Sequence, residues 1–218
     1  VGSFTSISEA QSAMSWYGVS GTVYTASQYC VTVCRTTDGT ILFEFDCGRD
    51  QSLAVSPQSS SGKAVTWFKG YQYYGDFEYV RRSGEKLTVI NIVDIEDYVK
   101  GVLPYEMSGS WPIEALKAQA LCARTYAASH FNANDYYGFD VTNDTYSQVY
   151  RGLNSATSTS DAAVDATAGI YILYKGEPIT AMYCSSNGGA TENSENVMSS
   201  AVGYLRGKVD SFEAAAAS

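Results

Sequence analysis

An alanine-rich segment at residues 112–131 most constrains what this chain can fold into. It reads PIEALKAQALCARTYAASHF, and Pro112 suits the first turn of a long helix. Apolar residues occupy several sides of that helix, so we expect it to be buried almost all round. They are Ile113, Leu116, Ala120, Ala123 and Ala127 on a small-residue face, with Ala118, Leu121 and Cys122 elsewhere. The second half of the chain is therefore expected to build its core around this segment.

The chain before about residue 93 is predicted to be mostly β-structure, and helices alternate with strands after it. Ser6-x-x-Glu9 predicts a helix over residues 6–16, and Asp94 caps a helix that Pro104 should end. Strands are expected on both sides of Asp38-Gly39 and at 65–69, 77–82, 87–93, 170–176 and 177–186, with a short helix at 159–168. The predicted fold is α+β, with the alanine-rich helix packed on antiparallel strands.

Two cysteines fall near each other in the first predicted hairpin. If Asp38-Gly39 forms a two-residue turn, Cys30 lies opposite Cys47 at a separation that permits a disulfide. Buried free thiols on an apolar face explain the same pattern equally well. Both interpretations stay open at the level of sequence.

Charge and composition exclude some classes of partner. The chain has 14 Lys+Arg against 23 Asp+Glu, a net charge of −9, so binding to a nucleic acid backbone is not expected. Its 18 tyrosines suit an uncharged, sugar-like partner, although tyrosine is equally common in β-sheets. No apolar run approaches the ~20 residues of a membrane-spanning helix. We expect an extracytoplasmic protein whose export signal or membrane anchor lies upstream.

Most familiar catalytic schemes lack their residues. His130 is the only histidine and has no serine signature near it, and neither zinc-site nor phosphate-loop spacing is present, so no metal or cofactor is expected. Glu106 stands out instead. It is predicted to lie in a short loop flanked by Pro104, Tyr105, Met107 and Trp111, an apolar collar that disfavours the ionised carboxylate and suits a general acid for glycosidic cleavage. The alternative is an ordinary exposed glutamate.

Two further features are ambiguous on their own. Lys117 and Arg124, seven residues apart, share a stripe of the alanine-rich helix that is normally solvated, although its apolar surroundings leave little room for that alone. The turn from Ser185 to Thr191 has small hydrogen-bonding groups and two glycines that allow close approach of a ligand. It is equally consistent with an ordinary exit from a strand.

A resemblance connects these features. Residues 89–130 read VINIVDIEDYVKGVLPYEMSGSWPIEALKAQALCARTYAASH, and FDVTNDTYSQVYRG, DAT-G and YCSSNGGATENSENV follow in order at 139–152, 165–169 and 183–197. Together they resemble the core signature of the stage II sporulation protein D family, which includes amidase-enhancer proteins. The resemblance implies a catalytic domain at 64–210, after a helix and hairpin region at 1–63 and before a tail at 211–218.

The resemblance implies a lytic transglycosylase. Such an enzyme cuts the β-1,4 bond between N-acetylmuramic acid and N-acetylglucosamine in peptidoglycan glycan strands and leaves 1,6-anhydro ends. Sporulation members prefer strands that a partner amidase has already stripped of stem peptides. The family's catalytic glutamate falls on Glu106, and the sugar's C6 hydroxyl replaces a second carboxylate. Positions expected to line the groove are Lys117, Arg124, Gln148, Tyr150, Tyr183, Ser185, Ser186, Asn187, Gly188, Gly189 and Thr191.

The chain departs from the family at one place, and two other functions remain open. Some members carry a zinc-associated Cys…His-Cys arrangement, where this chain has Thr142, Tyr146 and Ser147, so zinc is not expected and hydrogen bonds from Asn143, Asp144 and Tyr146 should hold the loop. One alternative function is a non-catalytic glycan-binding or amidase-activating module. The other is a hydrolase whose second carboxylate is Glu192, Asp140 or Asp144.

Overall fold

The computed structural model describes residues 4–82 and 86–213 and divides the chain into two compact units. The first unit is Val1–Thr66 with Gly75–Val93, and the second is Trp67–Tyr74 with Asp94–Ser218. The boundary therefore lies near residue 93, where the sequence pattern changes, and a short segment inserted before it joins the second unit. Most of the predicted tail, 214–218, lies outside the described residues.

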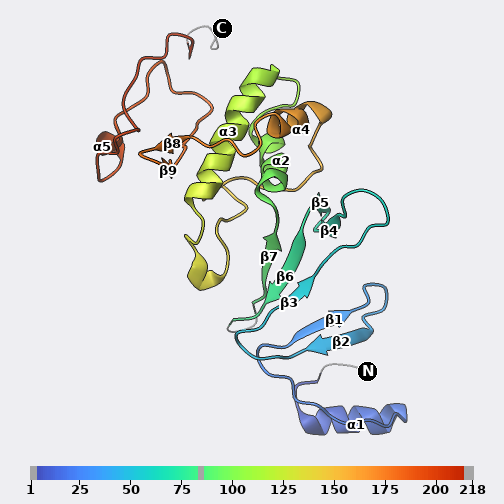
Figure 1. Ribbon diagram of the computed structural model, residues 1–218. Coiled ribbons are helices and arrows are strands. Elements are labelled where there is room, and N and C mark those ends of the chain that lie inside the picture. The colour runs from blue at the N-terminus through green and yellow to red at the C-terminus, as the bar shows by residue number, and fades with distance from the viewer. Residues whose placement is uncertain (1–3, 83–85, 214–218) are drawn as a thin grey trace. The chain divides into compact units, whose positions relative to one another are not determined.

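The first unit is built from one helix and two antiparallel sheets. Strand β6 is the centre of a three-stranded sheet with order β3-β6-β7, and Phe77 and Val80 on it are buried. Strands β1 and β2 form a separate hairpin (Figure 1). The elements are α1 (Ile7–Tyr17), β1 (Val31–Cys34), β2 (Ile41–Phe45), β3 (Leu53–Val55), β6 (Asp76–Val80) and β7 (Thr88–Ile92).

The cap predicted for α1 is present. The Ser6 hydroxyl accepts a hydrogen bond from the Glu9 N–H at 3.2 Å, and Gly18 ends the helix with φ 62°. The Glu9 carboxylate accepts instead from Thr5, so only half of the capping box forms. No residue of α1 is buried. The helix is thus specified by local signals rather than by packing.

The predicted register of the first hairpin is wrong by one residue. Val31 pairs with Phe45, and the register shifts again between Val33 and Cys34. The cause is a longer turn, in which the Gly39 N–H donates to the Arg35 carbonyl at 2.9 Å and the Arg35 N–H to the Thr40 carbonyl at 2.8 Å. A one-residue slip turns side chains to the opposite face.

This slip decides between the two interpretations of the cysteines. Cys30 is buried, Cys47 is exposed, and all five cysteines are free thiols. The structure therefore has no Cys30–Cys47 disulfide. Both thiols are free, but only that of Cys30 is buried as the alternative interpretation expected. Burial raises the pKa of the Cys30 thiol, which disfavours the reactive thiolate.

The second unit has a core of three helices, with short strands around it. Helices α2 and α4 both pack against α3 and against each other (Figure 1). The elements are the hairpin of β4 (Thr66–Phe68) and β5 (Tyr71–Tyr73), then α2 (Ile95–Glu106), α3 (Ile113–Ser129), η1 (Asp135–Tyr137), α4 (Ser158–Asp165), β8 (Leu173–Tyr174), β9 (Glu177–Pro178) and α5 (Ser194–Val197). The α+β class is confirmed, but α3 packs mainly on helices rather than on a sheet. Among the described helices, none has the length and apolar character needed to cross a bilayer.

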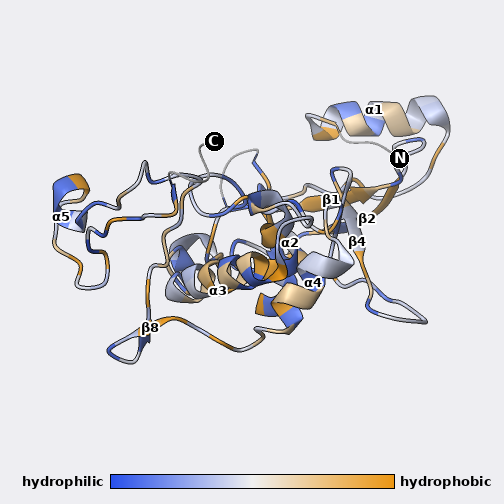
Figure 2. Ribbon diagram, turned by 90° about the horizontal axis from the view of Figure 1, so that it is seen from above, coloured by the Kyte–Doolittle hydropathy of each residue, from blue (hydrophilic) through white to orange (hydrophobic). Residues whose placement is uncertain are grey.

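The small residues of α3 allow its close packing. Leu116, Ala120 and Ala123 have no exposed surface and Ala127 is buried, as predicted, whereas Ile113 in the first turn is exposed. They meet Val99, Val102 and Leu103 of α2 and Ala163 and Val164 of α4, which are also fully buried. Apolar residues recur along these helices (Figure 2). The small-residue face is thus buried as predicted, but the expected burial on nearly all sides is wrong: Ala118 is exposed, and Leu121 and Cys122 are only half-buried.

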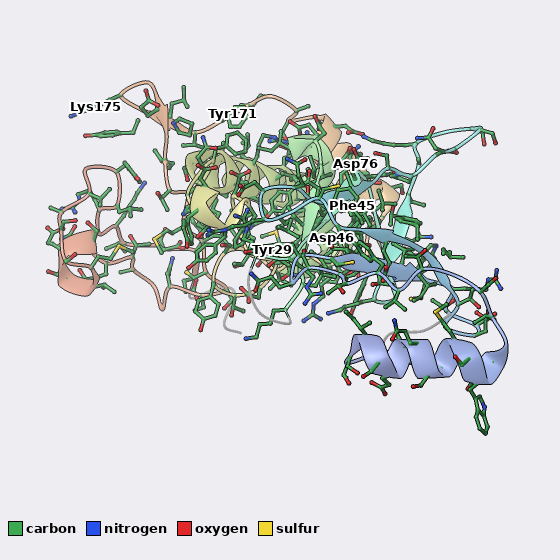
Figure 3. All side chains as sticks on the ribbon, turned by 90° about the horizontal axis from the view of Figure 1, so that it is seen from below. Tyr29, Phe45, Asp46, Asp76, Tyr171 and Lys175 are labelled. Atoms are coloured by element: carbon green, nitrogen blue, oxygen red, sulfur yellow. The ribbon has the colours of Figure 1, made fainter. Side chains whose placement is uncertain are left out.

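Two other local predictions need correction. Helix α2 continues two residues past Pro104, because a proline near the end of a helix breaks only one late hydrogen bond. The strands predicted at 170–176 and 177–186 shrink to two residues each. They meet at a turn in which Lys175 and Gly176 have φ 55° and 91°, and Lys175 lies at its tip (Figure 3).

A glycine joins the β4–β5 hairpin to the rest of the second unit. Gly152 has φ 66°, and a Cβ there would lie 2.0 Å from the Gln72 carbonyl oxygen. The neighbouring Leu153 N–H donates to that same oxygen at 2.8 Å, so the two backbones cannot separate without losing this bond. Only glycine fits this position.

We expect Gly152→Ala to lower the free energy of unfolding by roughly 2–4 kcal/mol, from backbone strain and the clash together. Gly188→Ala is the matched control: its φ is 67°, but a Cβ there meets nothing within 4 Å. Gly188→Ala should lower the free energy of unfolding by about 1 kcal/mol, from backbone strain alone. Urea denaturation measures both, and equal losses would show that the contact with Gln72 is relaxed at no cost.

Candidate active site

Glu106 is the last residue of α2 and is half-buried. The helix begins at Asp94, whose carboxylate accepts from the Glu96 N–H at 2.9 Å, and the Met107 N–H closes it on the Leu103 carbonyl at 2.9 Å. The expected position in a loop is therefore corrected to a helix end. A carboxylate fixed on a buried helix has fewer conformations than one on a loop, which favours a defined role.

The environment of Glu106 also differs from the expected collar. Trp111 is about half exposed, and the Tyr105 hydroxyl donates to the Arg151 carbonyl at 3.2 Å. The negative charge of Glu106 instead contributes to raising the pKa of two tyrosines, Tyr98 and Tyr183. These phenols stay neutral near pH 7.

A buried hydrogen-bond network connects these tyrosines through Gln148. The Tyr98 hydroxyl donates to Gln148 Oε1 at 3.1 Å. Gln148 Nε2 donates to the Tyr183 hydroxyl oxygen at 3.1 Å and to the Ala123 carbonyl at 3.3 Å. Gln148 itself is only 2% exposed. It therefore joins α2, α3 and the segment that carries Tyr183.

The pKa of Tyr183 is raised. Burial is the largest cause; the hydrogen bond from Gln148 opposes it, and the charge of Glu106 and a hydrogen bond with its carboxylate add to it. The pKa of Tyr98 is raised mainly by burial, with a small contribution from Glu106. Both phenols therefore remain protonated beside the carboxylate.

Tyr150 is a packing residue in this structure. It is buried, and its ring lies 4.8 Å from that of Tyr98 and 5.4 Å from that of Tyr73, centroid to centroid. A Cβ at Gly101 would come within 2.3 Å of its ring, so the absence of a side chain there makes the room. Of the expected groove residues, Gln148 and Tyr150 are thus brought close to Tyr98 but are covered by protein.

The two cations of α3 have different surroundings. Lys117 is partly exposed and pairs with Glu114 at 2.8 Å, one turn earlier. Arg124 has no exposed surface. Its guanidinium binds the Glu96 carboxylate at 2.6–3.0 Å and donates to the Val164 carbonyl at 3.2 Å. Arg124 was expected to line the groove, and the structure instead buries it among α2, α3 and α4, where a glycan cannot contact it.

The turn at 185–191 is exposed over most of its length and is held by the chain that follows it. The Asn187 amide donates to the Asp210 carboxylate at 2.9 Å, and the Thr191 N–H donates to the Lys208 carbonyl at 2.9 Å. Gly188 and Gly189 have φ 67° and 99°, and a Cβ at either would meet nothing within 4 Å. The remaining members are Ser185 and Ser186, of which Ser186 bonds Glu213.

The loop with Thr142, Tyr146 and Ser147 is held by hydrogen bonds to Asp144, one of the three residues expected to hold it; Asn143 and Tyr146 take part through backbone atoms, and the Tyr146 side chain is exposed. Asp144 Oδ1 accepts from the Thr142 hydroxyl at 2.9 Å and the Tyr146 N–H at 3.1 Å. His130 has a similar structural role at the end of α3, where its ring stacks on Tyr126 with centroids 4.2 Å apart. Within 4–82 and 86–213, no three His, Cys, Asp or Glu side chains are grouped as metal ligands.

The other carboxylates considered for catalysis are engaged in holding loops. Asp140 accepts from the Asn132 N–H at 2.7 Å, and Glu192 accepts from the Asn193 N–H and the Asn196 amide, both at 2.7 Å. Asp144 holds its own loop, as described above. Each of these carboxylates would therefore have to break its loop hydrogen bonds before it could act as a nucleophile or a base.

Sequence reasoning missed Tyr98 and Glu96. Both lie in the segment IEDYVKG, on the same helix as Glu106, where the pattern predicts a helix but no role for either side chain. Their partners are 50 and 28 residues away in the sequence. A long-range hydrogen bond leaves no local signal.

Comparison with known proteins gives the family. Residues 83–174, which contain α2, α3 and α4, match the family described as Stage II sporulation protein. The chain belongs to the stage II sporulation protein D and amidase-enhancer family. The family match thus covers most of the segments that carry the resemblance, and it includes the three helices at the core of the second unit.

Three relatives illustrate the similarity. An uncharacterized protein of Brachyspira hyodysenteriae is 46% identical over 140 residues, 63% of this chain and 38% of that protein. The amidase enhancer of Bacillus subtilis is 38% identical over 73% of this chain and 22% of its own length. Stage II sporulation protein D of Bacillus subtilis is 35% identical over 52% of this chain and 38% of its own. The chain thus spans between about a fifth and two fifths of these relatives.

Proposed function

We propose that this protein is a lytic transglycosylase of bacterial cell-wall glycan, with Glu106 as its catalytic group. Glu106 in its acid form protonates the glycosidic oxygen as the bond to the N-acetylmuramic acid anomeric carbon breaks. The resulting carboxylate then removes the proton from that sugar's C6 hydroxyl as its oxygen bonds to the anomeric carbon. The 1,6-anhydro product forms, and Glu106 is protonated again.

One observation carries this proposal: within the family segment, a half-buried carboxylate ends a helix, and its charge contributes to raising the pKa of two tyrosines. A transglycosylase needs one carboxyl group that alternates between acid and base, whereas most hydrolases need two. Asp140, Asp144 and Glu192 are occupied by loop hydrogen bonds, which supports the single-residue scheme. The exposed turn at 185–191 and Lys117 are proposed to contact the strand.

The proposal includes a setting and a partner. The amidase enhancer among the relatives suggests a cell-wall amidase as a partner, which would supply glycan strands without stem peptides. The substrate lies outside the cytoplasm, so we propose that the protein acts there. Sporulation and wall remodelling during growth are both compatible with this activity.

A second candidate function is supported by the same relative. A protein that is 38% identical over 73% of this chain is named for enhancing an amidase. The alternative is therefore a non-catalytic module that binds glycan or activates an amidase.

The deciding experiment incubates peptide-free glycan strands with the protein and determines the products by mass spectrometry. We expect anhydro-muramoyl ends, which are lighter by one water than reducing ends. Reducing ends would replace the proposal by hydrolysis. If no product forms while the strands still bind, or if an added amidase alone is stimulated, the module is the correct function.

A further inference from the structure

Two contacts with a distant part of the chain lie on either side of Glu106. One residue before it, the Tyr105 hydroxyl donates to the Arg151 carbonyl at 3.2 Å. Three residues after it, Gly109 lies against Thr157, so closely that a Cβ at Gly109 would be 3.0 Å from Thr157 Cγ2 and closer still to Oγ1. The end of α2 that carries Glu106 is therefore held at two points by one and the same segment.

The side chain of Thr157 is fixed where Gly109 meets it. Thr157 is the N-cap of α4: its hydroxyl accepts from the Ser160 N–H at 3.1 Å, and its own N–H donates to the Ser160 hydroxyl at 2.8 Å. Rotation of this β-branched side chain would break the cap. Helix α4 in turn packs on α2 and α3 and contains Ala163 and Val164, which are fully buried. Thr157 is therefore a firm surface for the turn that contacts it.

Gly109 is required by this contact and not by its own backbone. Its φ is not positive, so an alanine could adopt the same conformation without strain. It lies within a turn in which the Trp111 N–H donates to the Ser108 carbonyl at 3.0 Å. A methyl group added at Gly109 must therefore displace this turn from Thr157, and with it the helix end to which the turn is joined.

We propose that Tyr105 and Gly109 are positioning residues for Glu106: their contacts fix the end of α2 and so the place from which its carboxylate acts. The inference rests on the proposed function for its catalytic meaning. A misplacement of about 1 Å at a reacting group can slow a reaction about 100-fold, and an enzyme that relies on one carboxyl group depends on its placement. Neither positioning residue contacts the strand in this scheme, so their loss should lower kcat rather than raise KM.

The first test needs no catalytic turnover and measures amide hydrogen exchange by NMR. The Met107 N–H, which donates to the Leu103 carbonyl at 2.9 Å, closes α2 after Glu106 and reports on the helix end. The amide of Leu103, which is fully buried, reports on global unfolding. Gly109→Ala should accelerate exchange at Met107 at least about fivefold more than at Leu103. Equal acceleration at the two amides, or none at Met107, overturns the inference.

A second-site change distinguishes this contact from other effects of an added methyl group. Thr157→Gly removes the three atoms nearest to a Cβ at Gly109, and glycine is nearly as good an N-cap as threonine. Exchange at Met107 in Gly109→Ala/Thr157→Gly should return to within about twofold of its rate in Thr157→Gly. Gly21→Ala is the matched control and should change nothing: Gly21 also lacks a positive φ, and a Cβ there would lie 3.8 Å from Met14, an ordinary contact.

The second test measures cleavage of peptide-free glycan by the same variants, with thermal unfolding to verify that each is folded. Gly109→Ala should lower kcat about 10- to 100-fold with KM within about threefold, and the addition of Thr157→Gly should restore kcat to within about threefold of wild type. Tyr105→Phe removes one hydroxyl and should lower kcat about three- to tenfold. Tyr146→Phe, at a site 89% exposed, is its matched control and should leave kcat unchanged.

A raised KM with unchanged kcat, or a loss of kcat that Thr157→Gly does not restore, overturns the inference. Should Gly109→Ala not fold, Tyr105→Phe decides by the same two readouts. If the wild-type protein cleaves no glycan, the proposed function fails, and hydrogen exchange still decides whether the two contacts fix the end of α2.

Discussion

Replacing Glu106 by glutamine is expected to reduce glycan cleavage at least about 10³-fold while leaving KM nearly unchanged. An amide of the same size neither gives nor takes the proton, so both halves of the proposed reaction lose their catalyst. The amide occupies the same volume at the end of α2, so the helix end should stay folded. Initial rates of soluble-product release from peptide-free glycan measure the loss, and circular dichroism verifies the fold.

The matched control for this variant is Glu114→Gln. Glu114 is an exposed glutamate in the first turn of α3, and its carboxylate pairs with Lys117 in the next turn. Its replacement removes the same negative charge away from Glu106 and should leave kcat within about twofold; because Glu114 pairs with Lys117, which is proposed to contact the strand, any effect should appear in KM. If Glu106→Gln kept more than a tenth of the wild-type rate, the acid would have to be another group, and the transglycosylase scheme would be rejected.

The features of the fold that could be predicted are those specified by neighbouring residues. The caps at Ser6 and Asp94 are encoded within three residues of the helix start, and the small-residue face of α3 follows from helical spacing alone. The first hairpin failed because its register depends on turn length. Asp38 bonds both Arg35 and the Thr40 N–H, which favours a longer turn than Asp-Gly alone indicates.

The same holds for the site: some of its residues can be recognised from their neighbours in the sequence, but their contacts come from residues far away in the sequence. Glu106 was selected from its chemistry, yet Tyr183, whose pKa its charge helps to raise, lies 77 positions later and not in the expected collar. Arg124 and Lys117 occupy one stripe of α3, but α2 and α4 cover only the former. Helical spacing places residues on a face, and tertiary packing alone determines which end of that face is covered.

The buried ion pair of Arg124 gives the largest expected effect on stability. Its guanidinium, 0% exposed, binds Glu96 through Nε and Nη2, and Glu96 also accepts from the Gly169 N–H at 2.9 Å. Glu96→Gln leaves a positive charge in the interior without its counter-charge. We expect the free energy of unfolding to fall by about 3–5 kcal/mol. Urea denaturation followed by circular dichroism measures it.

Two further variants distinguish the loss of stability caused by an unpaired buried charge from the loss caused by removing a contact. Glu114→Gln breaks an ion pair on the same helix α3 that is largely solvated, and it should cost less than about 1 kcal/mol. In the double variant Glu96→Gln/Arg124→Met no unpaired charge remains, so its loss should be smaller than the sum of the two single losses. Two results would contradict a buried pair: strictly additive losses of unfolding free energy, or a loss for Glu96→Gln no larger than that for Glu114→Gln. Either result would mean that water reaches Arg124.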